Sequence, residues 1–480
     1  MNRIAVIDVV GLSRSVIGDH TPFIKSFINR NKLVPVKPIL PALTTSAQTS
    51  YLTGTYPSQH GVVGNGWYDR VDSEIKFWKQ SAKLVQGETI WQTAKKRNAN
   101  FTCAQMFWWF NMYNDADYSA TPRPNYLADG RKIPDCYTHP ASLRDDLTAR
   151  LGPFPLFSFW GPNANIKSSQ WIAQAAMWVE EKHQPTLNLI YLPHLDYCLQ
   201  KFGPSATETH VELEKIDQLV KETVEFFEKR GVEVLLLSEY GISPVNQPVH
   251  INRILRQANL LAVRIERGLE LLDAGASKAF AVADHQIAHI YCRTEAEIQQ
   301  VKSLLSKQDG IAKVLDKADQ RAHEIDHNRS GDLILIAAPQ AWFTYYFWLD
   351  DKQAPDYARM VDIHKKPGYD PVEMFMTSKS RALYKLLLKK IGFRSVLDVI
   401  PLDASLIKGS HGSSEVSEEY WPVLIGKGVP NHQDFHAIEI KSVLLDKIFG
   451  REQREPGAEQ IRLKPNGEAE TGESASQRYA

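Results

Sequence analysis

Thr44 has the setting in this sequence that is best suited to chemistry. The residues from Pro41 to Asn65 predict a strand, then a hydroxyl residue at the start of a helix, then an irregular loop that ends in the asparagine. Upstream, Asp8 closes an apolar strand over residues 4–8. A hydroxyl at a helix N-terminus, near a carboxylate able to bind a metal ion, can serve as the nucleophile of a phosphoryl transfer. The alternative is an ordinary capping threonine.

Polar side chains follow three apolar runs that have the character of buried strands. The runs and their polar groups are 4–10 with Asp8, 187–192 with His194 and Asp196, and 232–237 with Glu239. Apolar strands that recur between helical segments indicate a mostly parallel sheet covered on both faces. Ligands of such sheets gather at the carboxyl ends of the strands. We therefore expect these groups to meet in one crevice and to form a metal site.

The overall composition excludes several classes of protein. The chain has 480 residues, 43% of them hydrophobic, and a formal net charge of zero, so nothing favours a nucleic-acid polymer as partner. Its four cysteines are far apart and predict neither a disulfide framework nor a cysteine zinc site. The sequence shows no signal peptide and no apolar run of membrane-spanning length. We expect a cytoplasmic protein without membrane association, and the sequence gives no indication of oligomeric state.

The pattern of elements changes near residue 262. A strand, an amphipathic helix and two further strands are predicted at 288–292, 295–306, 312–315 and 332–338. We interpret residues 262–345 as a small α+β cap inserted into an α/β catalytic core formed by residues 1–261 and 346–450. Residues 451–480 are rich in charged residues, poor in apolar ones, and predicted to be a disordered tail.

Four motifs together resemble the nucleotide pyrophosphatase/phosphodiesterase branch of the alkaline phosphatase superfamily. They are the block Thr44–Asn65, the segment around Asp196 (Leu192–Pro204), the segment around Glu239 (Leu237–Ile242), and His411-Gly412 followed by Tyr420–Leu424. All four occur in the family's order. The family spacing favours Thr44 over the adjacent hydroxyls of Thr45 and Ser46.

The resemblance implies an alkaline-phosphatase-like fold and a hydrolase with two divalent metal ions, zinc in most members. In this family a threonine attacks phosphorus in line, and water then releases the covalent phospho-enzyme. Thr44 matches the nucleophile and Asn65 the residue that binds a phosphate oxygen. Asp8 matches a ligand of the ion that activates Thr44, whereas Asp196 and His411 match ligands of the other ion.

The sequence departs from the family pattern at two imidazoles. Gln200 stands where the family has a histidine, and Glu239-Tyr240 replaces an Asp-His pair. Glu239 can still bind a metal, but a tyrosine phenol with an ordinary pKa near 10 is a poor ligand. A site richer in oxygen than in nitrogen would favour manganese or magnesium over zinc.

Four histidines are candidates to replace the missing ligands. We assign His364, in a polar turn-rich segment, to the metal site. His194, two residues before Asp196, would face the same side as that carboxylate if the strand continued. His285 and His289 are further candidates, although a structural role at the cap fits them better.

Aromatic and basic residues near the motifs suggest weaker hypotheses. The run Phe107–Tyr113 could stack on a base, but a strand buried on both faces is the preferred interpretation. Trp67 and Tyr68 are placed to touch a leaving group, and the pair Lys365-Lys366 could bind a second phosphate or remain solvated.

We therefore predict a metal-dependent hydrolase of phosphodiester or pyrophosphate bonds that acts on a small phosphorylated substrate, with nucleotides as one class. The alternatives are a phosphomonoesterase or phosphonate hydrolase, and a catalytically degenerate protein that binds a nucleotide or phosphorylated ligand. A sulfatase is disfavoured because the region after Thr44 lacks the proline and arginine of that chemistry.

Overall fold

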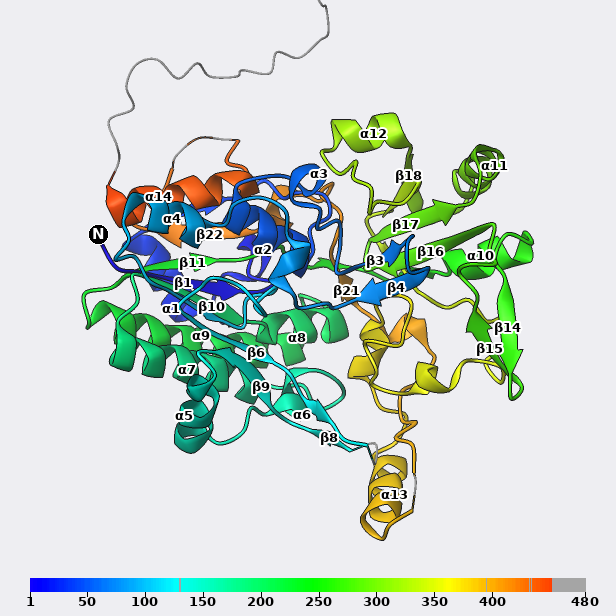
Figure 1. The fold of residues 1–480 in the computed structure, drawn as a ribbon, viewed down its shortest axis with the longest axis horizontal. Helices are drawn as coiled ribbons and strands as arrows, with labels where there is room; N and C mark the ends of the chain where they lie inside the picture. Colours follow the sequence, from blue (N-terminus) through cyan, green and yellow to red (C-terminus); the bar gives the residue numbers. More distant parts are fainter. Residues whose placement is uncertain (129–130, 394, 431, 433, 451–480) are drawn as a thin grey trace, which may run out of the picture.

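Two hydrophobic cores organise the chain in a computed structural model that describes residues 1–128, 131–393, 395–430, 432 and 434–450. The predicted tail, 451–480, lies outside the described residues. The larger core surrounds an eight-stranded sheet, and the smaller core surrounds a four-stranded sheet. The two bodies lie side by side in Figure 1.

The eight-stranded sheet has the order β2-β22-β11-β1-β10-β5-β6-β9. Its strands are β1 (Ile4–Val9), β2 (Lys32–Pro35), β5 (Cys103–Met106), β6 (Tyr118–Pro122), β9 (Cys136–His139), β10 (Leu187–Leu192), β11 (Glu233–Leu237) and β22 (Val423–Gly426). The five central strands are mutually parallel, and the three outer strands pair antiparallel. All six residues of β1 are buried, as expected for a strand covered on both faces.

Helices cover both faces of this sheet. Figure 1 shows α1, α7 and α9 on one face and α2, α4 and α14 on the other. The main helices of this body are α1 (Pro22–Asn29), α2 (Thr44–Thr53), α4 (Ile90–Arg97), α5 (Ser142–Leu151), α7 (Lys167–His183), α8 (His194–Phe202), α9 (Thr207–Glu228) and α14 (Ile440–Phe449). A mostly parallel sheet between two helical layers confirms the predicted α/β class.

The four-stranded sheet is antiparallel, with the order β16-β17-β19-β18. Its elements are β16 (Ala279–Asp284), β17 (Ile287–Cys292), α11 (Glu295–Leu305), β18 (Ile311–Leu315), α12 (Lys317–Ala322) and β19 (Leu333–Ala337). The strand, helix and two strands predicted here from sequence are all present, within one residue at each end.

The smaller body extends beyond the cap predicted at residues 262–345. Its core is formed by Phe77 and by residues between Val245 and Ile407, including the aromatic run Tyr345–Trp348. Residues between Tyr346 and Ile407 thus contribute to the smaller core, and the chain returns to the large sheet only at β22. The further elements of this region are α10 (Ile251–Gln257), β13 (Gln247–Val249), β14 (Val263–Glu266), β15 (Leu269–Leu272), β20 (Ala341–Phe343), α13 (Lys379–Lys390) and β21 (Gly409–Ser410).

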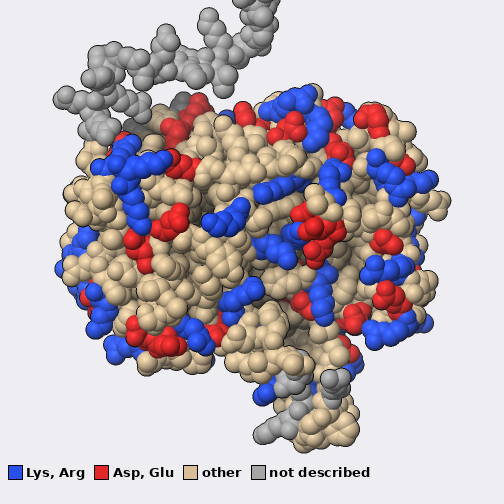
Figure 2. All heavy atoms as spheres, in the orientation of Figure 1, with Lys and Arg blue, Asp and Glu red and all other residues tan. Residues whose placement is uncertain are grey.

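The face of the molecule drawn in Figure 2 carries both signs of charge. Figure 2 shows Lys and Arg side chains interspersed with Asp and Glu over this face, in keeping with the net charge of zero. Within the part of the chain that the structure describes, no helix combines the length and apolar character needed to cross a membrane.

Candidate functional site

Helix α2 begins at Thr44, as predicted, and all ten of its residues are buried. The three consecutive hydroxyls at its start have different partners. Thr45 Oγ1 donates to the Gly64 carbonyl at 2.8 Å, and Ser46 Oγ donates to the Pro41 carbonyl at 2.7 Å. Thr44 Oγ1 instead lies 3.0 Å from the Tyr240 hydroxyl. Of the three, Thr44 is the hydroxyl that faces the side chains at the strand ends.

Asp8 and Glu239 form a buried carboxylate pair because β1 and β11 are adjacent and parallel. Gln48, one turn after Thr44, contacts one oxygen of each. Its Nε2 donates to Glu239 Oε1 and lies 3.5 Å from Asp8 Oδ2. The Trp109 backbone N–H donates to Gln48 Oε1, which fixes the amide with its NH2 group toward the carboxylates. Asp8 Oδ1 and Glu239 Oε2 are buried without a hydrogen-bond partner.

The pair is electrostatically costly without a cation. Burial raises the pKa of Glu239 to about 7. Burial, followed by repulsion from Glu239, raises the pKa of Asp8 well above its ordinary range. Among the described residues, the hydrogen-bond donor to the two carboxylates is Gln48 rather than a lysine or an arginine. A buried, unpaired carboxylate is disfavoured, so this pair must share a proton or bind a cation.

Asp196 lies on the other side of Thr44, in the first turn of α8. The Tyr240 hydroxyl donates to Asp196 Oδ1 at 3.2 Å, and Gln200 Nε2 donates to Oδ2 at 2.9 Å. The Tyr369 hydroxyl in turn donates to Gln200 Oε1 at 3.0 Å. Both oxygens of Asp196 thus have a partner, although burial still raises the pKa of this carboxyl to about 7.

His411 follows β21 and stacks flat on Tyr240, with ring centroids 3.5 Å apart and an interplanar angle of 8°. Its Nδ1 bonds to the Ala42 carbonyl at 2.8 Å. Its Nε2 is buried without a hydrogen-bond partner, 3.6 Å from Asp196 Oδ1. The structure therefore brings Asp8, Thr44, Asp196, Glu239 and His411 to the ends of the three central strands, as the sequence pattern suggested.

Asn65 is held by a residue that sequence reasoning missed. Asp284, at the end of β16, accepts from the Asn65 backbone N–H at 2.9 Å and from Asn65 Nδ2 at 3.2 Å. Its Oδ1 also bonds His285 Nδ1 at 2.7 Å. His285 lies in the β16–β17 turn with φ of 60° and stacks on Tyr369 at 3.6 Å. The smaller body thereby completes the site, but no motif near Asp284 signals this.

Two of the histidines considered as replacement ligands have structural partners instead. His194 lies on helix α8 rather than on a strand, because the strand ends before Pro193, and its Nε2 bonds Glu212 Oε2 at 2.7 Å. His289 bonds the Val63 carbonyl and accepts from the Gly331 N–H. Neither imidazole is hydrogen-bonded to the carboxylate cluster formed by Asp8, Asp196 and Glu239.

His364, which we assigned to the metal site, lies among other charged groups. Its side chain is exposed, and the charged residues that act on it are Lys132, Asp362 and Lys79. None of these belongs to the carboxylate cluster. Next to it, Lys366 is fully buried between Asp370 and Glu373, with 2.7 Å contacts to each, so it is not a free phosphate-binding amine.

The aromatic run Phe107–Tyr113 is a loop rather than the predicted strand, because β5 ends at Met106 and three of its residues have positive φ. Phe107, Trp108 and Phe110 nevertheless belong to the buried core, as expected. Trp67 packs beneath Arg329 and Tyr68 against Phe280, so both serve the contact between the bodies.

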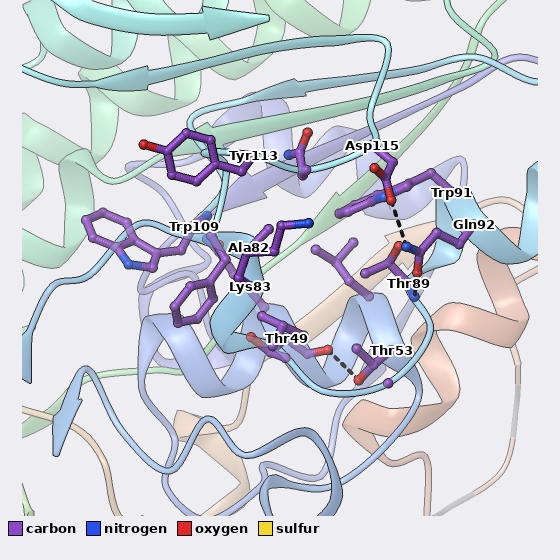
Figure 3. A pocket seen from close by; sticks show the side chains of 16 residues that line it. Thr49, Thr53, Ala82, Lys83, Thr89, Trp91, Gln92, Trp109, Tyr113 and Asp115 are labelled. Carbon is purple, nitrogen blue, oxygen red and sulfur yellow. Dashed lines mark hydrogen bonds between the residues drawn. The ribbon is translucent and has the colours of Figure 1, made fainter. Parts of the chain in front are cut away.

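A cavity of about 240 Å³ borders the site on the side of Gln48. Figure 3 shows its walls, which include Thr49, Thr53, Trp91, Trp109 and Tyr113. Helix α2 contributes to both features: Thr44 faces the strand ends, Gln48 contacts the carboxylates and also lines the cavity, and the later turns of the helix line the rest of that wall. The walls combine aromatic side chains with hydroxyl, amide and charged groups, which suits a partly polar ring.

The residues fit one divalent cation but not two. In the described ranges, no group of three His, Cys, Asp or Glu side chains is arranged to hold a metal. The unpartnered oxygens of Asp8 and Glu239, together with the Thr44 hydroxyl, form an oxygen-only donor set of the kind that magnesium and manganese prefer. Around Asp196, Tyr240 and Gln200 already bind both carboxylate oxygens, and these residues do not fit a second ion.

Comparison with known proteins identifies similar sequences and folds. Residues 4–370 match the family model described as type I phosphodiesterase / nucleotide pyrophosphatase. An uncharacterized pyrophosphatase/phosphodiesterase of Schizosaccharomyces pombe is 26% identical over 251 residues, which cover 50% of this chain and 44% of that protein. The human bis(5'-adenosyl)-triphosphatase ENPP4 is 24% identical over 246 residues, 48% of this chain and 45% of that protein. This chain thus spans less than half the length of these two relatives.

Two solved structures share the fold over nearly the whole chain. Phosphonoacetate hydrolase from Sinorhizobium meliloti, in complex with phosphonoformate, has a TM-score of 0.59 and 14% identity, covering 93% of this chain and 96% of that one. Murine ENPP5, as an inactive variant in complex with AMP, has a TM-score of 0.56 and 13% identity, covering 93% and 95%.

Proposed function

The chain belongs to the type I phosphodiesterase / nucleotide pyrophosphatase family, and from this premise we propose that it hydrolyses phosphodiester or pyrophosphate bonds in small phosphorylated substrates. Nucleotides are the class to test first, since the ENPP5 neighbour was solved with AMP. The observation that carries the proposal is the position of Thr44. It is the first residue of the buried helix α2, and its hydroxyl faces the strand ends where Asp196 and the carboxylate pair lie.

In the proposed reaction, Thr44 Oγ1 attacks phosphorus, the bond to the leaving oxygen breaks, and the proton lost by the threonine hydroxyl is balanced by protonation of that leaving oxygen. The N-terminal N–H groups of α2 face the phosphate and favour its negative charge. Asn65, fixed by Asp284, orients a non-bridging oxygen. A bound cation would lower the pKa of the attacking hydroxyl and neutralise the developing charge. Water then hydrolyses the threonine ester and regenerates the hydroxyl.

The cavity beside Gln48 is a candidate binding site for a part of the substrate that does not react. Its walls include aromatic rings, and one of its lining residues, Gln48, is one helical turn from Thr44. We propose that it receives the leaving group or the base. Magnesium or manganese is the proposed cofactor, in place of the zinc pair that the resemblance implied. A cytoplasmic location stays a prediction from sequence.

Binding without turnover is the second candidate function, and one observation favours it. The Tyr240 hydroxyl lies between Thr44 and Asp196, at 3.0 and 3.2 Å, where the family has an imidazole. Thr44 itself is only 5% exposed. A phenol that satisfies the nucleophile in this way could hold it inactive.

A substrate panel distinguishes the candidates. Chromogenic phosphodiester, phosphomonoester and phosphonate substrates are offered with magnesium, manganese or zinc to the wild type, Thr44→Ala and Thr45→Ala. Thr45 is the matched control, because its hydroxyl is equally buried but bonds the backbone. Diester hydrolysis lost only in Thr44→Ala is the expected result. Monoester or phosphonate preference reassigns the substrate, and silence with retained nucleotide binding favours the second candidate.

A further inference from the structure

We infer that this chain binds one divalent cation, held by Asp8, Glu239 and Thr44, and that the Tyr240 phenol occupies the place of a second. The inference deepens the proposed function and rests on it for the identity of the site. It concerns binding stoichiometry, however, and can be tested without turnover.

The carboxylate pair retains two free acceptors. Gln48 binds one oxygen of Glu239 and approaches one of Asp8, while the other oxygen of each is buried and has no partner. Gln48 cannot turn to serve the free oxygens, because its own Oε1 accepts from the Trp109 N–H. Two buried acceptors and the adjacent Thr44 hydroxyl thus remain for one ligand. Buried acceptors of this kind require a donor or a cation.

Tyr240 blocks the second position, because its hydroxyl lies 3.0 Å from Thr44 Oγ1 and 3.2 Å from Asp196 Oδ1. A cation held by Asp196 and His411 would have to displace the Tyr240 hydroxyl from Asp196 Oδ1. The ring cannot move aside easily, because it lies flat against His411 at 3.5 Å and is 3% exposed. A neutral phenol is a poor ligand for a divalent ion, so the residue fills the position without replacing the lost imidazole.

Gln200 stands at the other lost imidazole and completes the hydrogen bonds of Asp196. Its amide nitrogen donates to Asp196 Oδ2, and its carbonyl oxygen accepts from the Tyr369 hydroxyl. Both ends of the amide are used. Tyr240 and Gln200 together occupy both oxygens of Asp196 with hydrogen bonds, whereas Asp8 and Glu239 each retain one buried oxygen without a partner.

Metal stoichiometry tests the inference directly. The full chain is stripped with a chelator, dialysed and titrated with Mn²⁺ and with Zn²⁺ by calorimetry, and bound metal is counted by elemental analysis. We expect one ion per chain for the wild type and for Tyr240→Phe, which removes the hydroxyl without adding a ligand. Asp8→Asn should lose the ion. Gln200→His combined with Tyr240→His should bind a second ion.

Two ions in the wild type, or none, would overturn the inference, and so would a well-folded double variant that still binds only one. Circular dichroism of each variant separates loss of a ligand from loss of fold, and the wild-type count stands even if the double variant does not fold. A chain that binds one ion but hydrolyses nothing would contradict the proposed function and leave this inference intact.

Discussion

Glu239→Gln should stabilise the metal-free protein while abolishing its response to divalent cations. Burial raises the pKa of Glu239 from 4.5 to about 7. Above pH 7 the carboxyl is ionised in both states, and because ionisation is less favourable in the folded state, it lowers the free energy of unfolding. A pKa difference of this size corresponds to about 3 kcal/mol. The amide has almost the same shape and no charge, and its oxygen can still accept from Gln48.

The size of the thermal shift follows from chain length. Unfolding entropy of about 2 cal/mol/K per residue gives about 1 kcal/mol/K for a chain of this size, so about 3 kcal/mol raises Tm by about 3 °C at pH 8 in chelator. For the wild type, Mn²⁺ at about 100 times its Kd adds about 2.7 kcal/mol, a similar rise. The variant should show no rise with Mn²⁺.

Glu373→Gln is the matched control for this experiment. Glu373 is as deeply buried as Glu239 but has a resident cation, Lys366 Nζ at 2.7 Å. Removing its charge leaves a buried lysine with one partner fewer and should lower Tm. A fall in the Tm of Glu239→Gln like that of the control would refute this explanation, and so would a rise in its Tm with Mn²⁺.

Three further predictions address pH, positioning and the cavity. In chelator, the buried carboxyls whose pKa is raised should contribute most to the free energy of unfolding below about pH 4. This contribution should be lost as pH rises to about 7, by about 4 kcal/mol for Asp196 alone. Urea melts from pH 4 to 8 measure this loss, and a flat profile contradicts it. Asp284→Asn places an amide against the donors of Asn65 and should lower kcat by about 10- to 100-fold with little change in KM; an unchanged kcat argues against positioning by Asp284. Ala82→Phe, at the cavity wall, should raise KM for nucleotide diesters by about tenfold but spare a small chromogenic diester; equal effects on both would exclude the cavity as a substrate pocket.

Local sequence signals predicted the elements that carry the main site. Continuous apolar runs indicated β1, β10 and β11, and because these strands are adjacent and parallel, the carboxylates that follow them meet. The start of α2 at Thr44 was also predictable, since a hydroxyl residue follows a strand-like segment there. In each case the residues that determine the element, an apolar run or a hydroxyl at a helix start, lie within a few positions of the functional side chain.

The remaining contacts depend on packing between distant segments. Asp284 binds Asn65 from 219 positions away, and nothing in its neighbourhood marks it as part of the site. His194 was expected at a strand end, but helix α8 starts at once after Pro193 and its imidazole bonds Glu212. Gln48 lies within the Thr44–Asn65 block, but its importance follows only from the two carboxylates that it contacts.

Trapping the covalent intermediate on Thr44 is the most direct test of the proposed chemistry. The wild type is mixed with a nucleotide diester and Mn²⁺, quenched with acid during turnover, digested, and analysed by mass spectrometry. We predict a phosphoryl or nucleotidyl group on the Thr44 hydroxyl in the wild type and in Thr45→Ala, and none in Thr44→Ala. Hydrolysis that persists in Thr44→Ala, or an adduct on any other residue, would contradict the assignment of Thr44 as the nucleophile.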